Sequence, residues 1–273
     1  MPQAVIAGVS SGIGSAIAER LAGRGWNVAG TSRRALSHSL AEHLGTAVIC
    51  DFVEGSSVDS ATREIVASTM PWDALILAPG TMNPIGPFAE VDFDQWAESV
   101  DVNVVNQLRF VHGLLGHANH GTALTPKCVF FAGGGTNSAS PAFSAYVMSK
   151  IALIKATELL DAEIPNMAFT IVGPGWVRTD IHEETLSAAL APPAVIEETR
   201  RRLEADDFVD MSEVLAAVDW VLEQPKEVVG GRNFSVTGDP MGEPAFPGFL
   251  AADPSLFKLR RWGNDAYWTR HES

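Results

Sequence analysis

Tyr146 and Lys150 are the two residues whose types and spacing indicate acid–base chemistry. They lie four residues apart in Tyr-Val-Met-Ser-Lys, a segment that is predicted to be helical, so both side chains are expected on one helix face. An unperturbed tyrosine ionises near pH ~10 and is a poor proton carrier at neutral pH. Because a nearby ammonium lowers the pKa of a phenol, we expect Tyr146 to serve as a general acid or base beside Lys150.

A glycine-rich turn near the start of the chain predicts a phosphate site. Residues 7–14 are Ala-Gly-Val-Ser-Ser-Gly-Ile-Gly, and they follow an apolar run and open a helical pattern. Such glycines allow a tight turn, close approach of the backbone to a pyrophosphate, and N–H groups that face the anion. A turn without a ligand is the alternative. The residues expected to bind a dinucleotide here are Gly8, Ser10, Ser11, Gly12, Ile13 and Gly14. A phosphate loop and a tuned tyrosine in one chain predict nicotinamide redox chemistry.

The residues after the second predicted strand favour NADP over NAD. An acidic residue there would bind the ribose hydroxyls of NAD, whereas this chain has Ser32 followed by Arg33 and Arg34. An arginine suits a 2′-phosphate, since the contact is charge-assisted. The alternative is that both arginines only solvate a turn. Asp51, just after the third strand, is placed to accept a hydrogen bond from the adenine amino group.

Composition excludes several classes of partner. The formal charge of −14 over 273 residues argues against nucleic acid or an anionic membrane surface, and no apolar stretch has the length of a membrane helix. Cys50 and Cys128 lie in apolar runs and are expected to be reduced core thiols. No metal-ligand spacing is present. Because the first strand is predicted almost at Met1, we expect no secretory leader and a cytoplasmic protein.

Apolar runs alternate with helical patterns along most of the chain, which is typical of an α/β fold with a parallel sheet. Strands are predicted at 4–7, 28–31, 47–50, 74–78, 127–132, 167–172 and 233–236. Helices are predicted at 12–24, 93–117, 144–163 and 209–224. We expect a single dinucleotide-binding and catalytic domain over 1–238, with a lid at about 180–207. An aromatic-rich extension, 239–273, is expected to pack on the domain or on a partner subunit.

The chain resembles the short-chain dehydrogenase/reductase family over about residues 3–238. The motifs that carry the resemblance are the three glycines of the phosphate loop, Tyr146 with Lys150, and Pro174-Gly175 after the sixth strand. The resemblance implies a Rossmann-type doubly wound sheet of about seven parallel strands with helices on both faces. It also implies hydride transfer to or from a nicotinamide, with Tyr146 as general acid/base and Lys150 holding the ribose.

The same resemblance assigns further site residues. Asn103 matches the asparagine that helps to order a proton-relay water, and Thr179 would lie near the nicotinamide carboxamide. The remaining residues of the expected cofactor site are Phe52, Ala78, Pro79, Gly80, Pro174, Gly175 and Val177. The resemblance further implies a homodimer or homotetramer through the helices that hold Asn103 and Tyr146.

Three departures from the family pattern stand out. Residues 77–80 are Leu-Ala-Pro-Gly instead of Asn-Asn-Ala-Gly, and Ser11 stands where many NADP-preferring members have a basic residue. The catalytic serine, about thirteen residues before the tyrosine, is replaced by Gly133. Loss of one such donor typically costs about 10²–10³-fold in rate. Thr136, Ser138 or the Gly134 N–H are the candidate replacements, and loss of activity is the alternative.

The leading hypothesis is an NADP-dependent oxidoreductase that reduces a small-molecule carbonyl, or oxidises the alcohol. The rival is a catalytically impaired NADP-binding sensor or assembly subunit, and a third possibility is a redox-neutral reaction such as epimerisation. The expected pocket suits a hydrophobic or cyclic ketone, and a sugar stacked on Trp176 is equally allowed. His182, Glu183 and Glu184 are expected to be solvated lid residues.

Overall fold

Seven parallel strands form one sheet in the computed structural model, which describes residues 1–10, 12–122 and 125–261. The strand order is β3-β2-β1-β4-β5-β6-β7. The strands are β1 (Gln3–Ala7), β2 (Asn27–Ser32), β3 (Thr46–Ile49), β4 (Ala74–Leu77), β5 (Lys127–Phe131), β6 (Ala168–Gly173) and β7 (Asn233–Ser235). The expected doubly wound α/β sheet is therefore confirmed.

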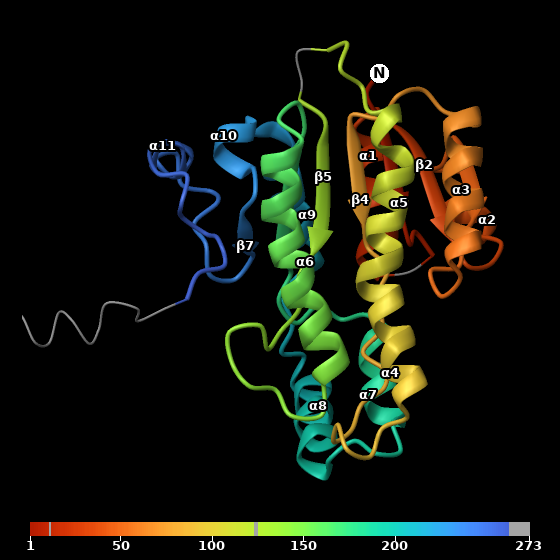
Figure 1. Ribbon diagram of the computed structural model, residues 1–273, viewed down its shortest axis with the longest axis vertical. Helices are drawn as coiled ribbons and strands as arrows, with labels where there is room; N and C mark the ends of the chain where they lie inside the picture. Colours follow the sequence, from red (N-terminus) through yellow and green to blue (C-terminus); the bar gives the residue numbers. More distant parts are fainter. Residues whose placement is uncertain (11, 123–124, 262–273) are drawn as a thin grey trace, which may run out of the picture.

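Helices cover both faces of the sheet, so strand side chains alternate between two cores. In β4, Leu75 and Leu77 enter one core, and Ala74 and Ile76 enter the other. The first core is closed by α3 (Gly55–Ser68), α5 (Asn106–Leu114) and α6 (Ser144–Glu163). The second is closed by α1 (Gly12–Gly23) and α9 (Met211–Glu223) (Figure 1).

The helix predicted over 93–117 is one continuous rod with a π-helical segment inside it. It consists of α4 (Phe93–Val100), the π-segment Asp101–Val105, α5 and a final 3₁₀ turn, Leu115–His117. Asn103 lies on the π-segment and is fully buried. Such bulges re-aim side chains within a helix and are frequent at functional sites.

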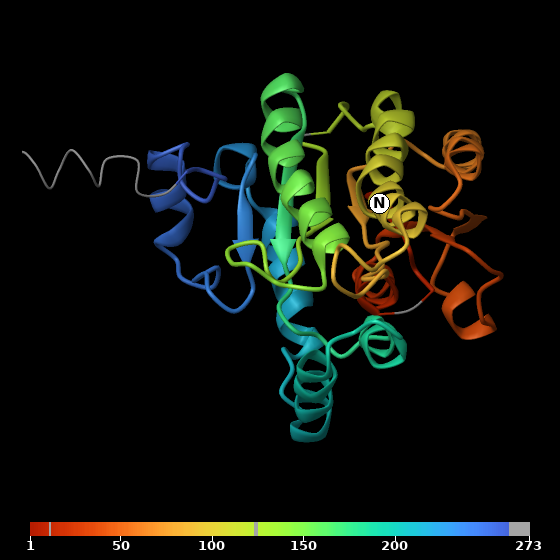
Figure 2. The same cartoon turned by 60° about the horizontal axis from the view of Figure 1, so that its bottom comes forward.

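Several helices of the structure were not predicted from the sequence. The largest is α3, whose inward positions Val58, Ala61 and Ile65 follow helical spacing between many polar residues. The others are α2 (His38–Ala41), α10 (Lys226–Val229) and α11 (Phe246–Ala252). The lid expected at 180–207 contains α7 (Ile181–Ser187) and α8 (Pro193–Ala205). Both lid helices lie at the bottom of Figure 1, on the side to which the β5 arrow points, and α8 projects from the body in Figure 2.

The described part of the C-terminal extension packs beside β7. The Asn233 N–H at the edge of the sheet donates to the Phe257 carbonyl at 2.8 Å. Phe246 stacks on Trp220 of α9 at 5.9 Å between ring centroids. The buried Arg232 guanidinium donates to the carbonyls of Leu250, Asp253 and Leu256 at 2.6, 3.1 and 2.9 Å. These contacts join 246–257 to the domain, while the aromatic residues Trp262, Tyr267 and Trp268 lie outside the described residues.

Cys50 and Cys128 are both buried free thiols, as expected. Along the described ranges of the chain, every helix is too short or too polar to cross a bilayer.

Candidate active site

Two adjoining cavities of about 440 and 680 Å³ lie among the loops that follow the sheet strands. The first contains Tyr146, Lys150 and the 174–184 segment. The second runs past Gly8, Arg33 and Asp51. The residues that line both are Arg33, Ala78, Pro79, Gly80 and Glu184. The two cavities are therefore halves of one cleft, which we call the cleft from here on.

The glycine loop has the geometry of a dinucleotide cradle. Gly8 and Gly12 have φ of +79° and +59°, where a side chain would strain the backbone. A Cβ at Gly14 would clash with the Gly8 carbonyl, lying 2.9 Å from its carbon, so the helix can approach the turn only with glycine there. A Cβ at Gly12 would lie 3.2 Å from the Thr179 methyl group, which places Thr179 directly against the loop. These residues leave backbone space that suits a pyrophosphate.

Three buried amides of the π-segment and α5 fix the loops that line the cleft. Asn103 pairs with the Thr81 backbone in both directions, accepting from its N–H at 3.0 Å and donating to its carbonyl at 2.9 Å. Asn106 donates to the Phe52 carbonyl at 2.8 Å, and Gln107 donates to the Pro79 carbonyl at 2.9 Å. The sequence prediction found Asn103 only. Asn106 and Gln107 have a recognisable signal, since they are uncharged polar residues on the core-facing side of an apolar helix.

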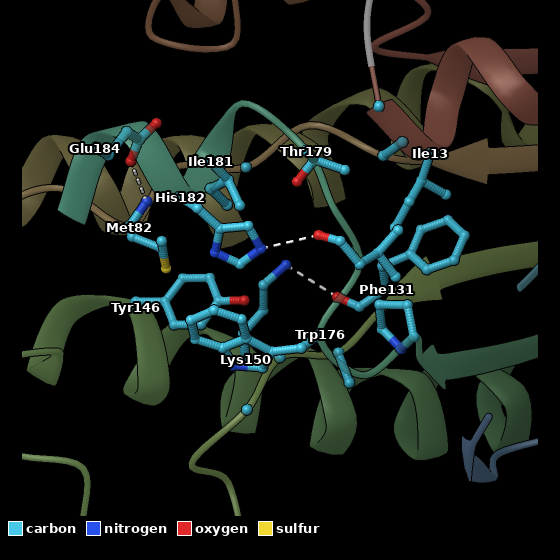
Figure 3. Close-up of a pocket in the computed structure, with 18 of the residues that line it drawn as sticks. Ile13, Met82, Phe131, Tyr146, Lys150, Trp176, Thr179, Ile181, His182 and Glu184 are labelled. Carbon is cyan, nitrogen blue, oxygen red and sulfur yellow. Dashed lines mark hydrogen bonds between the residues drawn. The ribbon is translucent and has the colours of Figure 1, made fainter. Parts of the chain in front are cut away.

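Tyr146 and Lys150 both project from α6 into the first cavity (Figure 3). The Lys150 ammonium lies 5.5 Å from the centroid of the tyrosine ring and donates to the Phe131 carbonyl at 2.9 Å. The expected common face is therefore observed.

The expected lowering of the tyrosine pKa is wrong for this state of the protein. Burial raises the pKa of Tyr146 to about 12, and the Glu184 carboxylate adds to that rise. Burial likewise lowers the pKa of Lys150 to about 8. Desolvation disfavours the charged form of each group and outweighs the favourable pairing that the spacing suggested. Tyr146 is thus a protonated phenol at neutral pH.

Gly133 lies directly against the tyrosine ring. A Cβ at this position would clash with the Tyr146 hydroxyl oxygen and would lie 2.6 Å from the carbon that carries it. Any residue other than glycine would therefore displace the phenol. The glycine that replaces the family serine and the position of the Tyr146 ring therefore depend on each other.

Ser140 is the serine that lines the first cavity with Tyr146, and the sequence prediction did not name it as a replacement for the family serine. Thr136 and Ser138 do not line the cleft, whereas Ser140 and Gly134 do. Gly135, with φ +81°, lets the loop turn back so closely that a Cβ there would lie 2.9 Å from the Ser140 Cβ. The spacing of apolar residues in the sequence does not indicate Ser140, because the path of a glycine-rich loop decides which hydroxyl faces inward.

The lid residues expected to be solvated are partly buried and bonded. His182 is buried, stacks on Trp176 at 4.3 Å and donates from Nε2 to the Val177 carbonyl at 2.8 Å. Burial lowers the pKa of His182. The Arg202 guanidinium lies 4.6 Å from the centroid of the same indole, so a sugar stacked on Trp176 would have to compete with both neighbours. Glu184 bonds across the cleft to residues 81–83, and of the three only Glu183 is exposed as expected.

Most of the predicted cofactor residues line the cleft. In the first cavity these are Gly12, Ile13, Arg33, Ala78, Pro79, Gly80, Tyr146, Lys150, Pro174, Gly175, Val177 and Thr179. The second cavity adds Gly8, Ser10, Asp51 and Phe52. Gly14, Arg34 and Asn103 do not line either cavity. Ser11 lies outside the described residues. One Asp51 carboxylate oxygen accepts from the Val53 N–H at 3.0 Å.

Comparison with known proteins identifies relatives of this chain. Residues 2–189 match the model of the short chain dehydrogenase family. The chain is 31% identical over 115 residues to serine 3-dehydrogenase of Agrobacterium fabrum, covering 41% of this chain and 46% of that protein, about half its length. It is 26% identical over 187 residues to a 3-oxoacyl-acyl-carrier-protein reductase of Escherichia coli, covering 65% and 74%.

A solved structure of a short chain dehydrogenase/reductase from Saccharomyces cerevisiae has the same fold. It matches with a TM-score of 0.78 at 22% identity, over 95% of this chain and 100% of that chain.

The contact between Gly133 and the phenol predicts an asymmetry between neighbouring glycines. Gly133→Ala is expected to destabilise the protein by about 1–3 kcal/mol, because overpacking forces Tyr146 to move. Gly134→Ala is the matched control, since a Cβ there meets nothing within 4 Å, and it should change the free energy of unfolding by less than about 0.5 kcal/mol. Urea denaturation measures both, and equal effects would contradict the packing described.

The burial of Tyr146 predicts that its phenol loses its proton at a higher pH than an ordinary tyrosine. The chain has two tyrosines, so the phenolate absorbance of the wild type minus that of Tyr146→Phe isolates one group. At pH 10, the ordinary midpoint, Tyr146 should still be protonated, with its pKa at about 12. The folded state favours the protonated phenol, so its stabilising contribution is complete below pH 10 and is lost as pH rises. A midpoint below 10 would show that Lys150 dominates after all.

Proposed function

The chain belongs to the short-chain dehydrogenase family, and on that premise we propose that it is an NADP(H)-dependent carbonyl reductase with Tyr146 as its general acid. Proteins of this family are oxidoreductases that bind a nicotinamide cofactor. The observation that supports the proposal most is the placement of Tyr146 and Lys150 on one face of α6, in a cavity that the glycine loop also lines. The phenol holds its proton at neutral pH, so it is in the form that can protonate a carbonyl oxygen.

The chain's own residues divide the work of such a reaction. The bound nicotinamide would supply the hydride. Tyr146 would donate its proton to the carbonyl oxygen, and Ser140 would offer a second hydroxyl to that oxygen. Lys150, whose pKa is lowered to about 8, is able to release a proton near neutral pH and so to restore the phenol. Asn103 would act as a positioning residue, because its side-chain amide is already paired with Thr81.

The cofactor would lie along the glycine loop and past Ala78, Pro79 and Gly80, between the two halves of the cleft. Arg33 supports NADP over NAD, because its exposed guanidinium lines the cleft and has no carboxylate partner among the described residues. Arg34 does not line the cleft. Asp51 would bind the adenine amino group through the carboxylate that caps the Val53 N–H.

The substrate side of the cleft has both polar and apolar lining. Its apolar lining comprises Met82, Phe143, Val147, Trp176 and Ile181. We therefore propose a moderately hydrophobic ketone or aldehyde as substrate. A homodimer or homotetramer through α4 and α6 agrees with the exposed Phe93 and Met148 on those helices, and a cytoplasmic location agrees with the two free thiols.

Turnover tests the proposed function. Purified protein with NADPH and a panel of ketones and aldehydes is expected to consume NADPH. Tyr146→Phe should lower kcat/KM by about 10²–10⁴-fold, the usual contribution of a general acid, while NADPH affinity persists. Turnover that survived Tyr146→Phe would refute the mechanism. Tight NADPH binding without turnover of any carbonyl would instead favour the sensor or assembly role.

Arg33 is expected to set the choice of cofactor. Arg33→Ala should raise the KM for NADPH by about 10-fold or more, since one charge-assisted contact is lost, and should leave the KM for NADH nearly unchanged. Arg34→Ala is the neighbouring control and should have the smaller effect. Equal losses with both cofactors would mean that Arg33 does not contact the 2′-phosphate.

A further inference from the structure

Glu184 is the lid residue that crosses the cleft. One oxygen of its carboxylate, Oε2, accepts from the Thr81 hydroxyl at 2.9 Å, from the Met82 N–H at 2.6 Å and from the Asn83 N–H at 3.2 Å. Hydrogen bonds to a charged acceptor are the stronger kind, and three donors converge here on one oxygen. A single α7 side chain thus holds three consecutive residues of the loop after β4.

The loop that Glu184 holds is also the loop that Asn103 holds. Thr81 pairs its backbone with the Asn103 amide and gives its side-chain hydroxyl to Glu184. The neighbouring Gly80 lies between Asn103 and Lys150, since a Cβ there would be 3.3 Å from the Asn103 oxygen and 3.8 Å from the Lys150 ammonium. A continuous set of polar contacts therefore runs from the lid through Thr81 to the buried π-segment.

Apolar contacts also hold the lid over the cleft, since Ile85 of the loop after β4 clusters with Ala191, and a Cβ at Gly86 would lie 2.7 Å from the Leu190 Cβ. These contacts come from the segment that follows α7. The helix has seven residues and packs mainly against α8 of the same lid. His182 and Trp176 anchor its first turn to the segment after β6. Glu184 lines both cavities, and Figure 3 shows it and His182 on the side opposite α6, with the bond to Met82 drawn. This carboxylate is the polar contact that closes the lid side of the cleft against the β4 side.

We propose that Glu184 is a positioning residue that holds α7 against residues 81–83 and so keeps the cleft closed before a ligand arrives. The inference rests on the proposed function only for the identity of the ligand, NADPH. A preformed closed lid raises apparent affinity, because a protein that closes only part of the time binds in proportion to that fraction. Loss of the carboxylate should therefore weaken cofactor binding, and because Glu184 also adds to the raised pKa of Tyr146, it should lower that pKa as well.

Residue-resolved hydrogen exchange of the apoprotein tests the contact directly. In Glu184→Ala, the Met82 amide should exchange about 10-fold faster or more, since it loses its charged acceptor. The Asn83 amide should change less, because it also donates to the Thr81 hydroxyl at 3.1 Å. The Thr81 amide donates to Asn103 instead, and its exchange should stay as in the wild type. Equally faster exchange of all three amides would mean general loosening, and unchanged exchange of Met82 would mean that Glu184 does not hold this loop. Either result overturns the proposal.

Binding and kinetics supply the second readout. Glu184→Ala should raise the Kd and KM for NADPH by about 10-fold. Glu184→Gln keeps the shape of the side chain, and its Kd and KM for NADPH should lie between those of the wild type and Glu184→Ala. Glu183→Gln is the matched control on the same helix, because Glu183 is exposed, and it should behave as the wild type. A fall in kcat with unchanged KM, or an equal effect of Glu183→Gln, would refute the positioning role.

A double-mutant cycle assigns the effect to the contact itself. Thr81→Ala removes one of the three donors, and its effect on exchange and on Kd should be less than additive with that of Glu184→Ala. Thr81→Ser keeps the hydroxyl and should restore wild-type behaviour. Additive effects would show that the two residues act independently and would overturn the proposal. The exchange measurements need no cofactor, so a protein that bound no NADPH would refute the proposed function and leave this test intact.

Discussion

The cleft depends on buried amides that hold loops with no strand to pair with. Where β3 and β4 end, the chain leaves the sheet ladder and its polar backbone groups need other partners. Asn106, Gln107 and Asn103 supply them from one side of a single helix. An amide can donate and accept without a charge, so it meets this need at full burial where a charged group would have to be neutralised. The π-segment matters because it sets the direction in which Asn103 points.

Burial explains the electrostatics of the pair on α6. Both Tyr146 and Lys150 are removed from water, and desolvation moves the pKa of each toward its neutral form. Tyr146 therefore stays protonated at neutral pH, and Lys150 has its pKa lowered to about 8. Both pKa shifts follow from depth in the protein as much as from residue type.

The sequence was sufficient for the sheet, the glycine cradle and the face shared by Tyr146 and Lys150, because each has a periodic or positional signal. It was insufficient for α3, whose three apolar inward positions stand among many polar residues, and for the direction of the tyrosine pKa. Spacing places Lys150 near Tyr146 but contains no information on how much water surrounds them. Ser140 and Glu184 were missed for a related reason, since each enters the cleft through the path of a loop or a lid and neither follows a repeat.

Gly133 and Tyr146 are best understood as one structural unit. A glycine in place of a serine looks like the deletion of one hydrogen-bond donor, a change that typically costs about 10²–10³-fold in rate. Here the space of the missing side chain holds the phenol itself, since a Cβ at 133 would lie 2.6 Å from the tyrosine Cζ. A serine at this position would thus displace the tyrosine hydroxyl. Gly134 and Gly135 let the loop bring a different hydroxyl, that of Ser140, to the cleft wall. The glycines at 133–135 therefore decide both where the phenol lies and which serine lines the first cavity.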